Sequence, residues 1–245
     1  MKIFSSSLNI QLKHLSAYSE IQNETFCSYG ILRGVGDCIK SSSNYIYIDN
    51  GYLNSSDRQF SKNLYERKFV SNIFDLSGYY RIIKNDLVIN NNYQNYSKKR
   101  LRALNFDLKD LNNNGDYIIL SEPSKYILEF NNEDEWVKNT YNQILKYSDR
   151  KIIIHNKFSK EPLRELLKKA YAFVSYQSTA GLKAIIEGVP AYFTYESLKK
   201  FGSLENINDR NLNYDLLYLA ANSQWKLNEF FSEDFKKYMN EIIRC

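Results

Sequence analysis

Between residues 116 and 194, short apolar runs alternate with amphipathic stretches, and no other feature of the chain restricts its fold as strongly. The apolar runs are DYIILS (116–121), KIIIH (151–155), YAFVSY (171–176) and PAYFT (190–194), and helical patterns occupy 133–149, 161–170 and 179–188. Apolar strands that alternate with helices are typical of βαβ units and a parallel sheet. Right-handed crossovers place the loops after such strands at one edge of the sheet, where ligands bind. The sequence therefore predicts an α/β fold with a site at the carboxyl ends of these strands.

The first half of the chain shows the same kind of pattern in a less regular form. Strands are predicted at 2–6, 44–49 and 79–83, a helix at 11–23, and a strand, a glycine-rich turn and a helix within TFCSYGILRGVGDCI (25–39). Residues 84–115 are rich in Asn and Lys, and this change of composition predicts a domain boundary near residue 112. The chain ends with two predicted helices, at about 211–222 and 226–243.

Bulk properties exclude several classes of protein. No apolar run approaches the 18 residues that a membrane-spanning helix needs, so we expect no membrane insertion. The three Cys residues show no CxxC spacing, which favours a reducing compartment such as the cytoplasm and argues against a zinc site. The net charge of +5 permits a basic face for an anionic partner. It also has a plainer explanation, because Asn, Ile, Lys and Tyr are all encoded by AT-rich codons.

The stretch VSYQSTAGLKAIIEGVPAYFT (174–194) interrupts two apolar runs with hydroxyl residues and a glycine. Ser178 and Thr179 follow a predicted strand and begin a predicted helix, whose first N–H groups have no partner inside the helix. Hydroxyl donors beside such N–H groups form a seat for phosphate, and Gly181 would keep side-chain bulk away from it. The alternative is purely structural, since Ser and Thr are common N-caps and Gly-x-Pro ends helices.

Charged side chains follow the neighbouring strand in KIIIHNK (151–157). His155 and Lys157 emerge at the same edge of the predicted sheet, and a phosphate seat beside Lys and His suits a nucleoside diphosphate. The chain lacks GxxxxGK[ST], which excludes a P-loop, and lacks a clean GxGxxG after its first strand, which argues against a standard NAD site.

Together, HNK and PLRELLKKAYAFVSYQSTAGLKAIIEGVPAYFT resemble the nucleotide-sugar half of GT-B glycosyltransferases. The similarity is greatest to the branch seen in capsule-type polysaccharide transferases and in phage-encoded glycosyltransferase-like proteins. It is clear over 115–230, and in the first half it is confined to patches such as YIYIDNGYL (45–53) and GYYRIIKN (78–85). The resemblance implies two Rossmann-like parallel-sheet domains facing across a cleft. They would be a trimmed acceptor-side domain (1–112) and a donor-binding domain (113–225), with a C-terminal helix (226–245) returning toward the first.

One position departs from the family pattern. The family usually carries a Glu where this chain has Lys183, and that Glu commonly holds the ribose hydroxyls of the donor. Lys cannot accept those hydrogen bonds. Three explanations stay open: the donor is held differently, Lys183 adds charge beside a phosphate or an acidic sugar, or the protein has lost activity.

Candidates in the first half are less specific. Asp49 ends a predicted strand and could act as general base on an acceptor hydroxyl, or form an Asx turn before Gly51. Arg33 and Arg81 lie beside predicted strands and could bind an anionic group or form surface ion pairs. A basic cluster in SKKRLR (97–102) is either a solvated linker or a contact for a phosphate backbone.

The function implied by the resemblance is sugar transfer from a nucleotide-activated donor to a hydroxyl acceptor, with no metal and no other cofactor. Ser178, Thr179, Gly181, Lys157, His155 and Lys183 would bind the donor. The acceptor would be a hydroxymethylated pyrimidine in phage DNA, which would make DNA a partner and the host cytoplasm the location. The alternatives are a surface or capsule polysaccharide, or a non-catalytic binding module. The sequence does not fix an oligomeric state.

Overall fold

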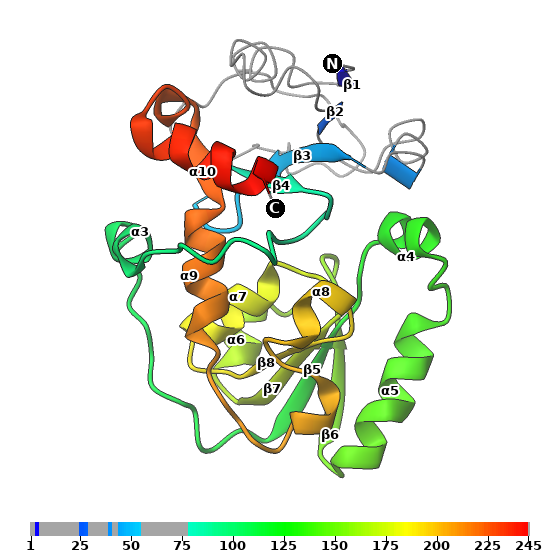
Figure 1. Cartoon of the computed structure of the whole chain (residues 1–245). Helices are drawn as coiled ribbons and strands as arrows, with labels where there is room; N and C mark the ends of the chain where they lie inside the picture. Colours follow the sequence, from blue (N-terminus) through cyan, green and yellow to red (C-terminus); the bar gives the residue numbers. More distant parts are fainter. Residues whose placement is uncertain (1–2, 5–24, 29–38, 41–43, 55–77, 245) are drawn as a thin grey trace. The chain divides into compact units, whose positions relative to one another are not determined.

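The computed structural model describes residues 3–4, 25–28, 39–40, 44–54 and 78–244 (Figure 1). The chain divides into two compact units, the first made of residues 1–96 and 220–245 and the second of residues 97–219. The division falls after Tyr96 and again after Leu219, whereas the domain limits predicted from the sequence lie near 112 and 225.

A four-stranded parallel sheet in the order β6-β5-β7-β8 forms the centre of the second unit. Its strands are β5 (Tyr117–Ser121), β6 (Lys151–His155), β7 (Ala170–Ser175) and β8 (Ala191–Phe193). All six residues of β7 are buried, as expected for a strand covered on both faces of a parallel sheet. The parallel α/β fold predicted from the apolar runs is confirmed for this unit, and it is compatible with a Rossmann-like fold.

Helices cover both faces of this sheet, α5 (Trp136–Tyr147) on one side and α6 (Leu163–Leu167) and α7 (Ala180–Ile186) on the other (Figure 1). This follows from the strand order, because the chain moves outward from β5 to β6 and then returns past β5 to β7. Trp136, Thr140 and Ile144 form the buried stripe of α5, one helical turn apart, as their spacing predicts.

Four short elements of this unit were not predicted. They are α3 (Lys98–Ala103), α4 (Lys125–Asn131), α8 (Glu196–Lys199) and the 3₁₀ turn η2 (Leu204–Asn206). Each spans two turns or fewer, which is too short for a hydrophobic period to show in the sequence.

A left-handed glycine ends α7 and returns the chain to β8. Gly188 has φ +80°, and a Cβ at this position would lie 2.1 Å from the Asp110 carbonyl oxygen. The Asn112 N–H donates to the Gly188 carbonyl at 2.9 Å, and the Lys109 N–H donates to the Ile186 carbonyl at 2.9 Å. The segment that precedes β5 therefore packs directly against the end of α7, where only glycine fits.

The first unit contains a mixed five-stranded sheet in the order β1-β2-β3-β4-β9. Its strands are β1 (Ile3–Phe4), β2 (Thr25–Ser28), β3 (Tyr45–Asn50), β4 (Tyr79–Lys84) and β9 (Gln224–Lys226). The first three are parallel, but β4 runs antiparallel to both β3 and β9, so the sheet differs from the parallel one that was expected. Apolar and β-branched residues identify a strand, but its direction depends on long-range pairing that they do not reveal.

The core of the first unit lies between this sheet and α10 (Glu233–Arg244). The helix buries an apolar stripe at i, i+3, i+4 and i+7, formed by Phe235, Tyr238, Met239 and Ile242. Aromatic rings pack edge to face in this core: the ring centroids of Trp225 and Phe235 are 5.2 Å apart, with an interplanar angle of 75°. The predicted helix at 226–243 in fact begins at Glu233, because β9 and the 3₁₀ turn η3 (Leu227–Glu229) precede it and the Ser232 Oγ accepts the Phe235 N–H at 3.1 Å.

Candidate functional site

Three polar residues end neighbouring strands at the carboxyl edge of the second unit's sheet. Ser121 of β5 pairs in register with His155 of β6 on one side and with Ser175 of β7 on the other. Ser121 and Ser175 are buried, with 8% and 0% of their surface exposed. Polar side chains therefore line the carboxyl edge of a sheet whose strands are otherwise mainly apolar.

The strand order makes this edge the place where a ligand crevice is expected. The loop after β5 leads to α4 and α5, and the loop after β7 leads to α7, on the opposite face of the sheet. Where adjacent strands send their loops to opposite faces, ligands of open α/β sheets bind between the two loops. The residues of interest are then those that follow Ser121 and Ser175.

Ser178 is part of the turn that starts α7. Its Oγ accepts the Ala180 N–H at 3.1 Å, and its own N–H donates to the Ser175 Oγ at 3.3 Å. Its carbonyl accepts the Gly181 N–H at 3.0 Å. The capping role foreseen as an alternative therefore applies to Ser178, although its hydroxyl hydrogen is still able to donate.

Thr179 differs from Ser178. It is the N-cap residue of α7, but its side chain makes no capping hydrogen bond, and it is only partly buried. Among the described residues, its hydroxyl has no hydrogen-bond partner. The Thr179 hydroxyl is thus a donor, next to the carboxyl edge of the sheet, that is not used in capping.

Gly181 has a packing reason to be glycine. A Cβ at this position would lie 2.6 Å from Cζ and 2.7 Å from Cε1 of Phe193, a β8 residue that is 1% exposed. The missing side chain lets α7 approach β8 closely. This contact explains the glycine without a ligand, so its predicted donor-binding role stays a prediction.

The basic residues of the site lie on two elements. His155 ends β6, and its Nε2 lies 3.2 Å from the Glu161 carbonyl oxygen. Lys157 is exposed in the next loop, with its Nζ 4.9 Å from the Phe158 ring centroid. Lys183 is exposed on α7, four residues after Thr179 and hence one turn along the same side. Neither lysine forms an ion pair with an acidic group of the described residues, so both charges are open to an anion.

Sequence reasoning missed three polar residues beside these. The Glu122 carboxylate, just after β5, accepts the Asn156 side-chain amide at 2.8 Å, which joins the loops after β5 and β6. The Gln177 side-chain oxygen, just after β7, is buried without a hydrogen-bond partner. All three lie within two residues of a strand's end, and this position is their signal in the sequence; charged and hydroxyl residues after β6 and β7 drew notice, but the amides Asn156 and Gln177 and the end of β5 did not.

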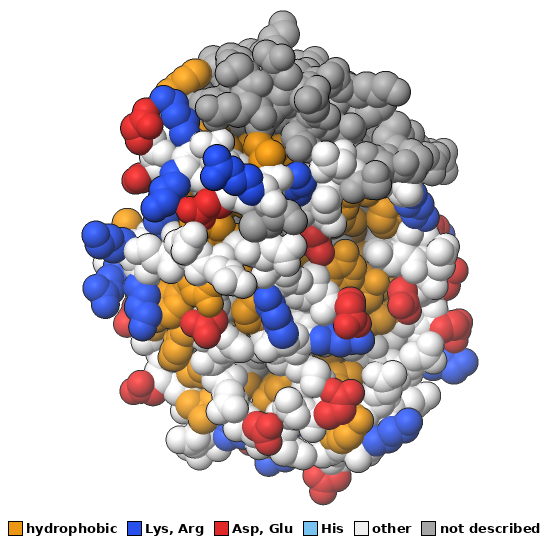
Figure 2. All heavy atoms as spheres, in the orientation of Figure 1, with side chains coloured by type: hydrophobic (Ala, Val, Ile, Leu, Met, Phe, Trp, Pro, Cys, Tyr) orange, Lys and Arg blue, Asp and Glu red, His pale blue; other side chains and the backbone are white. Residues whose placement is uncertain are grey.

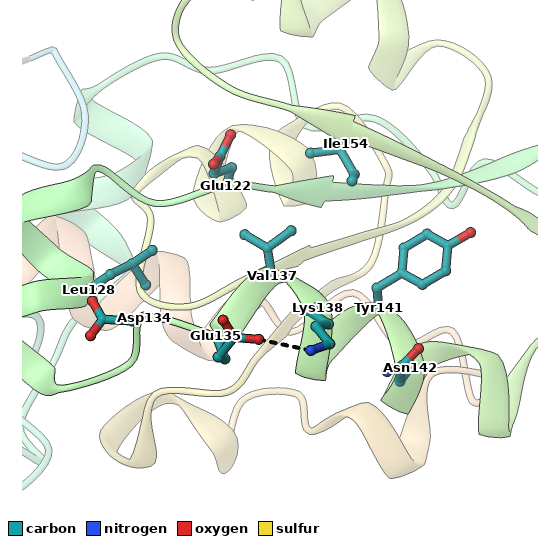
Figure 3. A pocket seen from close by; sticks show the side chains of 9 residues that line it. All are labelled: Glu122, Leu128, Asp134, Glu135, Val137, Lys138, Tyr141, Asn142 and Ile154. Carbon is teal, nitrogen blue, oxygen red and sulfur yellow. Dashed lines mark hydrogen bonds and ion pairs between the residues drawn. The ribbon is translucent and has the colours of Figure 1, made fainter.

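A hollow of about 460 Å³ lies on the α5 side of the sheet, next to this edge (Figure 3). Leu128, Val137 and Ile154 form its apolar part, and Glu122, Asp134 and Glu135 add carboxylates. Its single lysine, Lys138, is paired with Glu135 at 3.1 Å. The excess of negative charge makes this hollow a poor place for a diphosphate, in contrast to the edge beside Thr179.

The first-unit candidates Asp49 and Arg81 are bonded to each other. They face each other across β3 and β4, and the Asp49 Oδ2 accepts from both the Arg81 Nη2 and the Tyr47 hydroxyl, each at 2.8 Å. The Asp49 Oδ1 accepts the Asn50 N–H at 2.7 Å. The proposed Asx turn is not formed, because the Gly51 N–H donates to the Tyr79 carbonyl instead, at 2.8 Å.

Burial strengthens this cluster. The Asp49 and Arg81 side chains are 17% and 14% exposed, and the Arg81 guanidinium lies 5.8 and 5.5 Å from the Tyr47 and Tyr52 ring centroids. Burial and then the charge of Asp49 raise the pKa of Tyr47 well above its usual range. Burial lowers the pKa of Arg81, but Asp49 and the tyrosines outweigh this and raise it overall. The roles of Asp49 as base and Arg81 as anion ligand stay predictions, and Arg33 lies outside the described residues.

No protein-family model matches the chain, and no curated protein matches it. Among the described residues, no helix has both the length and the apolar character needed to cross a membrane. The residues of the carboxyl edge and the sequence motif that they contain therefore carry the evidence for function.

Proposed function

We propose that the chain is a metal-independent glycosyltransferase of the GT-B type, whose second unit binds a nucleotide-activated sugar. The supporting observation is the turn between β7 and α7. It contains the Thr179 hydroxyl, which has no partner among the described residues, and it follows β7 at the edge where parallel α/β sheets generally bind ligands. The motif around this turn is the one that resembles the donor-binding half of these enzymes.

In this proposal the donor diphosphate lies against the start of the β7–α7 turn. Thr179 donates its hydroxyl hydrogen to a phosphate oxygen, and Ser178 donates its own while its oxygen still caps Ala180. Lys183, one turn further along α7, and Lys157 supply positive charge. When the sugar leaves, the negative charge that develops on the nucleoside diphosphate is stabilised by these groups, which is the main catalytic contribution we assign to the second unit.

Glu122 offers the carboxylate that Lys183 cannot supply. It follows β5, the central strand at this edge, and Asn156 fixes its side chain at 2.8 Å. A carboxylate accepts hydrogen bonds from sugar hydroxyls, whereas an ammonium group only donates. We therefore assign the ribose or sugar hydroxyls of the donor to Glu122 and a phosphate or an acidic sugar to Lys183.

The acceptor is a hydroxyl compound, for which a hydroxymethylated pyrimidine in DNA and a surface polysaccharide are the two candidates. Asp49 remains the proposed base. Because its Oδ2 already accepts from Arg81 and Tyr47, taking the acceptor proton requires one of these bonds to be exchanged for the acceptor hydroxyl. A non-catalytic module that binds the donor without turnover is the competing function, favoured by the pairing of Asp49 and by Lys183.

Two measurements separate these proposals. Thermal-shift screening with nucleotides and nucleotide sugars should raise the melting temperature for one nucleotide class, because a ligand that binds only the folded state stabilises it. No stabilisation by any of them would count against both donor-binding functions. Slow hydrolysis of the stabilising donor without acceptor would then favour the enzyme, and its complete absence the non-catalytic module.

A further inference from the structure

The basic helix α3 stands apart from the other surface helices in how its charges are arranged. Lys98, Lys99, Arg100 and Arg102 lie within its six residues, and Arg100 is the only one of them that is partly buried rather than exposed. No Asp or Glu occurs between residues 87 and 106. Figure 2 shows a group of Lys and Arg side chains at the left of the view, where Figure 1 places α3.

Four other lysines on or next to helices of the second unit are balanced by a nearby Glu, whereas Lys146 and Lys183 are not. Lys125, Lys138, Lys168 and Lys199 each lie within 3.4 Å of a Glu three or four residues away. By contrast, Lys99 and Arg102 form no ion pair with a described residue. They lie three residues apart, on one face of α3. Like charges at this spacing destabilise a helix. The arrangement is thus unfavourable for α3 itself and suited to an external anion.

The helix holds these cations in a defined place. The Ser97 Oγ accepts the Lys99 N–H at 3.1 Å and caps the helix, while Leu101 is buried and anchors the opposite side. The Lys98 ammonium lies 5.3 Å from the ring centroid of Tyr218, on α9 (Tyr214–Asn222). A fixed basic surface beside an aromatic ring is the combination that tracks nucleic-acid backbones.

We infer that the exposed face of α3 binds the phosphodiester backbone of a nucleic acid. A lipid surface fits less well, because membrane-binding helices need an exposed apolar face and the leucine in the middle of α3 is buried. The inference does not rest on sugar transfer. If transfer occurs, this surface favours DNA over polysaccharide as the acceptor.

The test uses fluorescence anisotropy with a short duplex DNA and the corresponding single strand. If all four cations contact phosphates, affinity should fall about 150-fold between 50 and 200 mM salt, from a slope of about −0.9 per contact. Replacing Lys99 and Arg102 by Ala should weaken binding at low salt at least about tenfold and reduce the slope by about 2. Ala is the better helix former, so α3 should persist, which circular dichroism would verify.

The matched control removes two lysines that already have Glu partners, as Lys168→Ala with Lys199→Ala. It loses the same charge from the same unit and should keep the wild-type affinity and slope. Equal weakening by both double variants, or no binding of either DNA form by the wild type at low salt, would overturn the inference. So would tighter, α3-dependent binding to phosphatidylserine vesicles, which would assign the surface to lipid. Nucleoside diphosphate affinity measured in the same variants should not change, which keeps this test separate from that of the donor site.

Discussion

Replacing Asp49 by Asn would leave the Arg81 guanidinium largely buried without its counter-charge. The two side chains are 17% and 14% exposed, and their closest atoms are 2.8 Å apart. Removing one partner of a fully buried ion pair costs about 3–5 kcal/mol, and residual solvent access reduces this to about 2–4 kcal/mol here. The loss should appear mainly as destabilisation of the first unit, which contains both strands that carry the pair.

A second substitution shows whether the unpaired charge of Arg81 causes the loss of stability. Arg81→Met in the Asp49→Asn background removes the unpaired guanidinium, so the double variant should be more stable than Asp49→Asn alone. We expect the coupling energy of the double-mutant cycle to be about 2 kcal/mol. The exposed pair formed by Lys168 and Glu165 is the control, and Glu165→Gln should leave the stability close to that of the wild type.

Urea denaturation gives these values unit by unit. The chain has two Trp residues, and Trp225 lies in the core of the first unit whereas Trp136 lies in that of the second. In a Trp136→Phe background, fluorescence therefore follows the first unit alone. A coupling energy below about 0.5 kcal/mol, or an Asp49→Asn variant with unchanged stability, would refute the argument, and loss of turnover with intact stability would favour Asp49 as base instead.

Two further predictions concern packing and alkaline pH. Gly181→Ala should lower the free energy of unfolding by about 1–3 kcal/mol, because its Cβ would lie 2.6 Å from the Phe193 ring. Phe193→Leu in the same chain should reduce that loss. An equal loss in both backgrounds, measured by urea denaturation, would exclude this contact as the reason. Burial raises the pKa values of Tyr47 and Tyr52 above the usual 10.0, so above pH 10 the unfolded chain loses protons that the folded chain keeps, and stability falls as pH rises. Between pH 10 and pH 11 the unfolded tyrosine goes from about half to about nine-tenths ionised, so each buried tyrosine should lower the unfolding free energy by about 1 kcal/mol. The unfolding free energies of Tyr47→Phe and Tyr52→Phe should therefore each fall by about 1 kcal/mol less than that of the wild type over this range; an equal fall would contradict the raised pKa values.

The fold of the second unit was predictable from sequence because its strands are short apolar runs with clear limits. The three-residue strand β9 and the six-residue helix α3 were not, since neither is long enough to show a period. The mixed sheet of the first unit was also missed, because the pattern of a strand does not state which way its neighbour runs.

The grouping of the candidate residues was predictable from sequence, but their individual bonds were not. The strand ends meet at one edge of the sheet as predicted, but Ser178 and Thr179 look equivalent in sequence, and only the structure assigns the capping bond to Ser178. Likewise, the pairing of Asp49 with Arg81 joins residues 32 positions apart, and Gly181 packs against a strand that follows it. Such long-range contacts leave no local signal.

The most direct test of the donor site is calorimetric titration of three variants with the nucleoside diphosphate that stabilises the wild type. Thr179→Val and Lys157→Ala should each weaken binding by about 1–2 kcal/mol, or about five- to thirtyfold, with melting temperatures close to the wild type, because the described residues give neither group a structural bond of its own. Ser178→Ala should weaken binding and also lose about 1 kcal/mol of stability, since it removes the cap on Ala180. Unchanged affinity in all three variants would contradict the donor-site assignment, and with it the proposed glycosyltransferase.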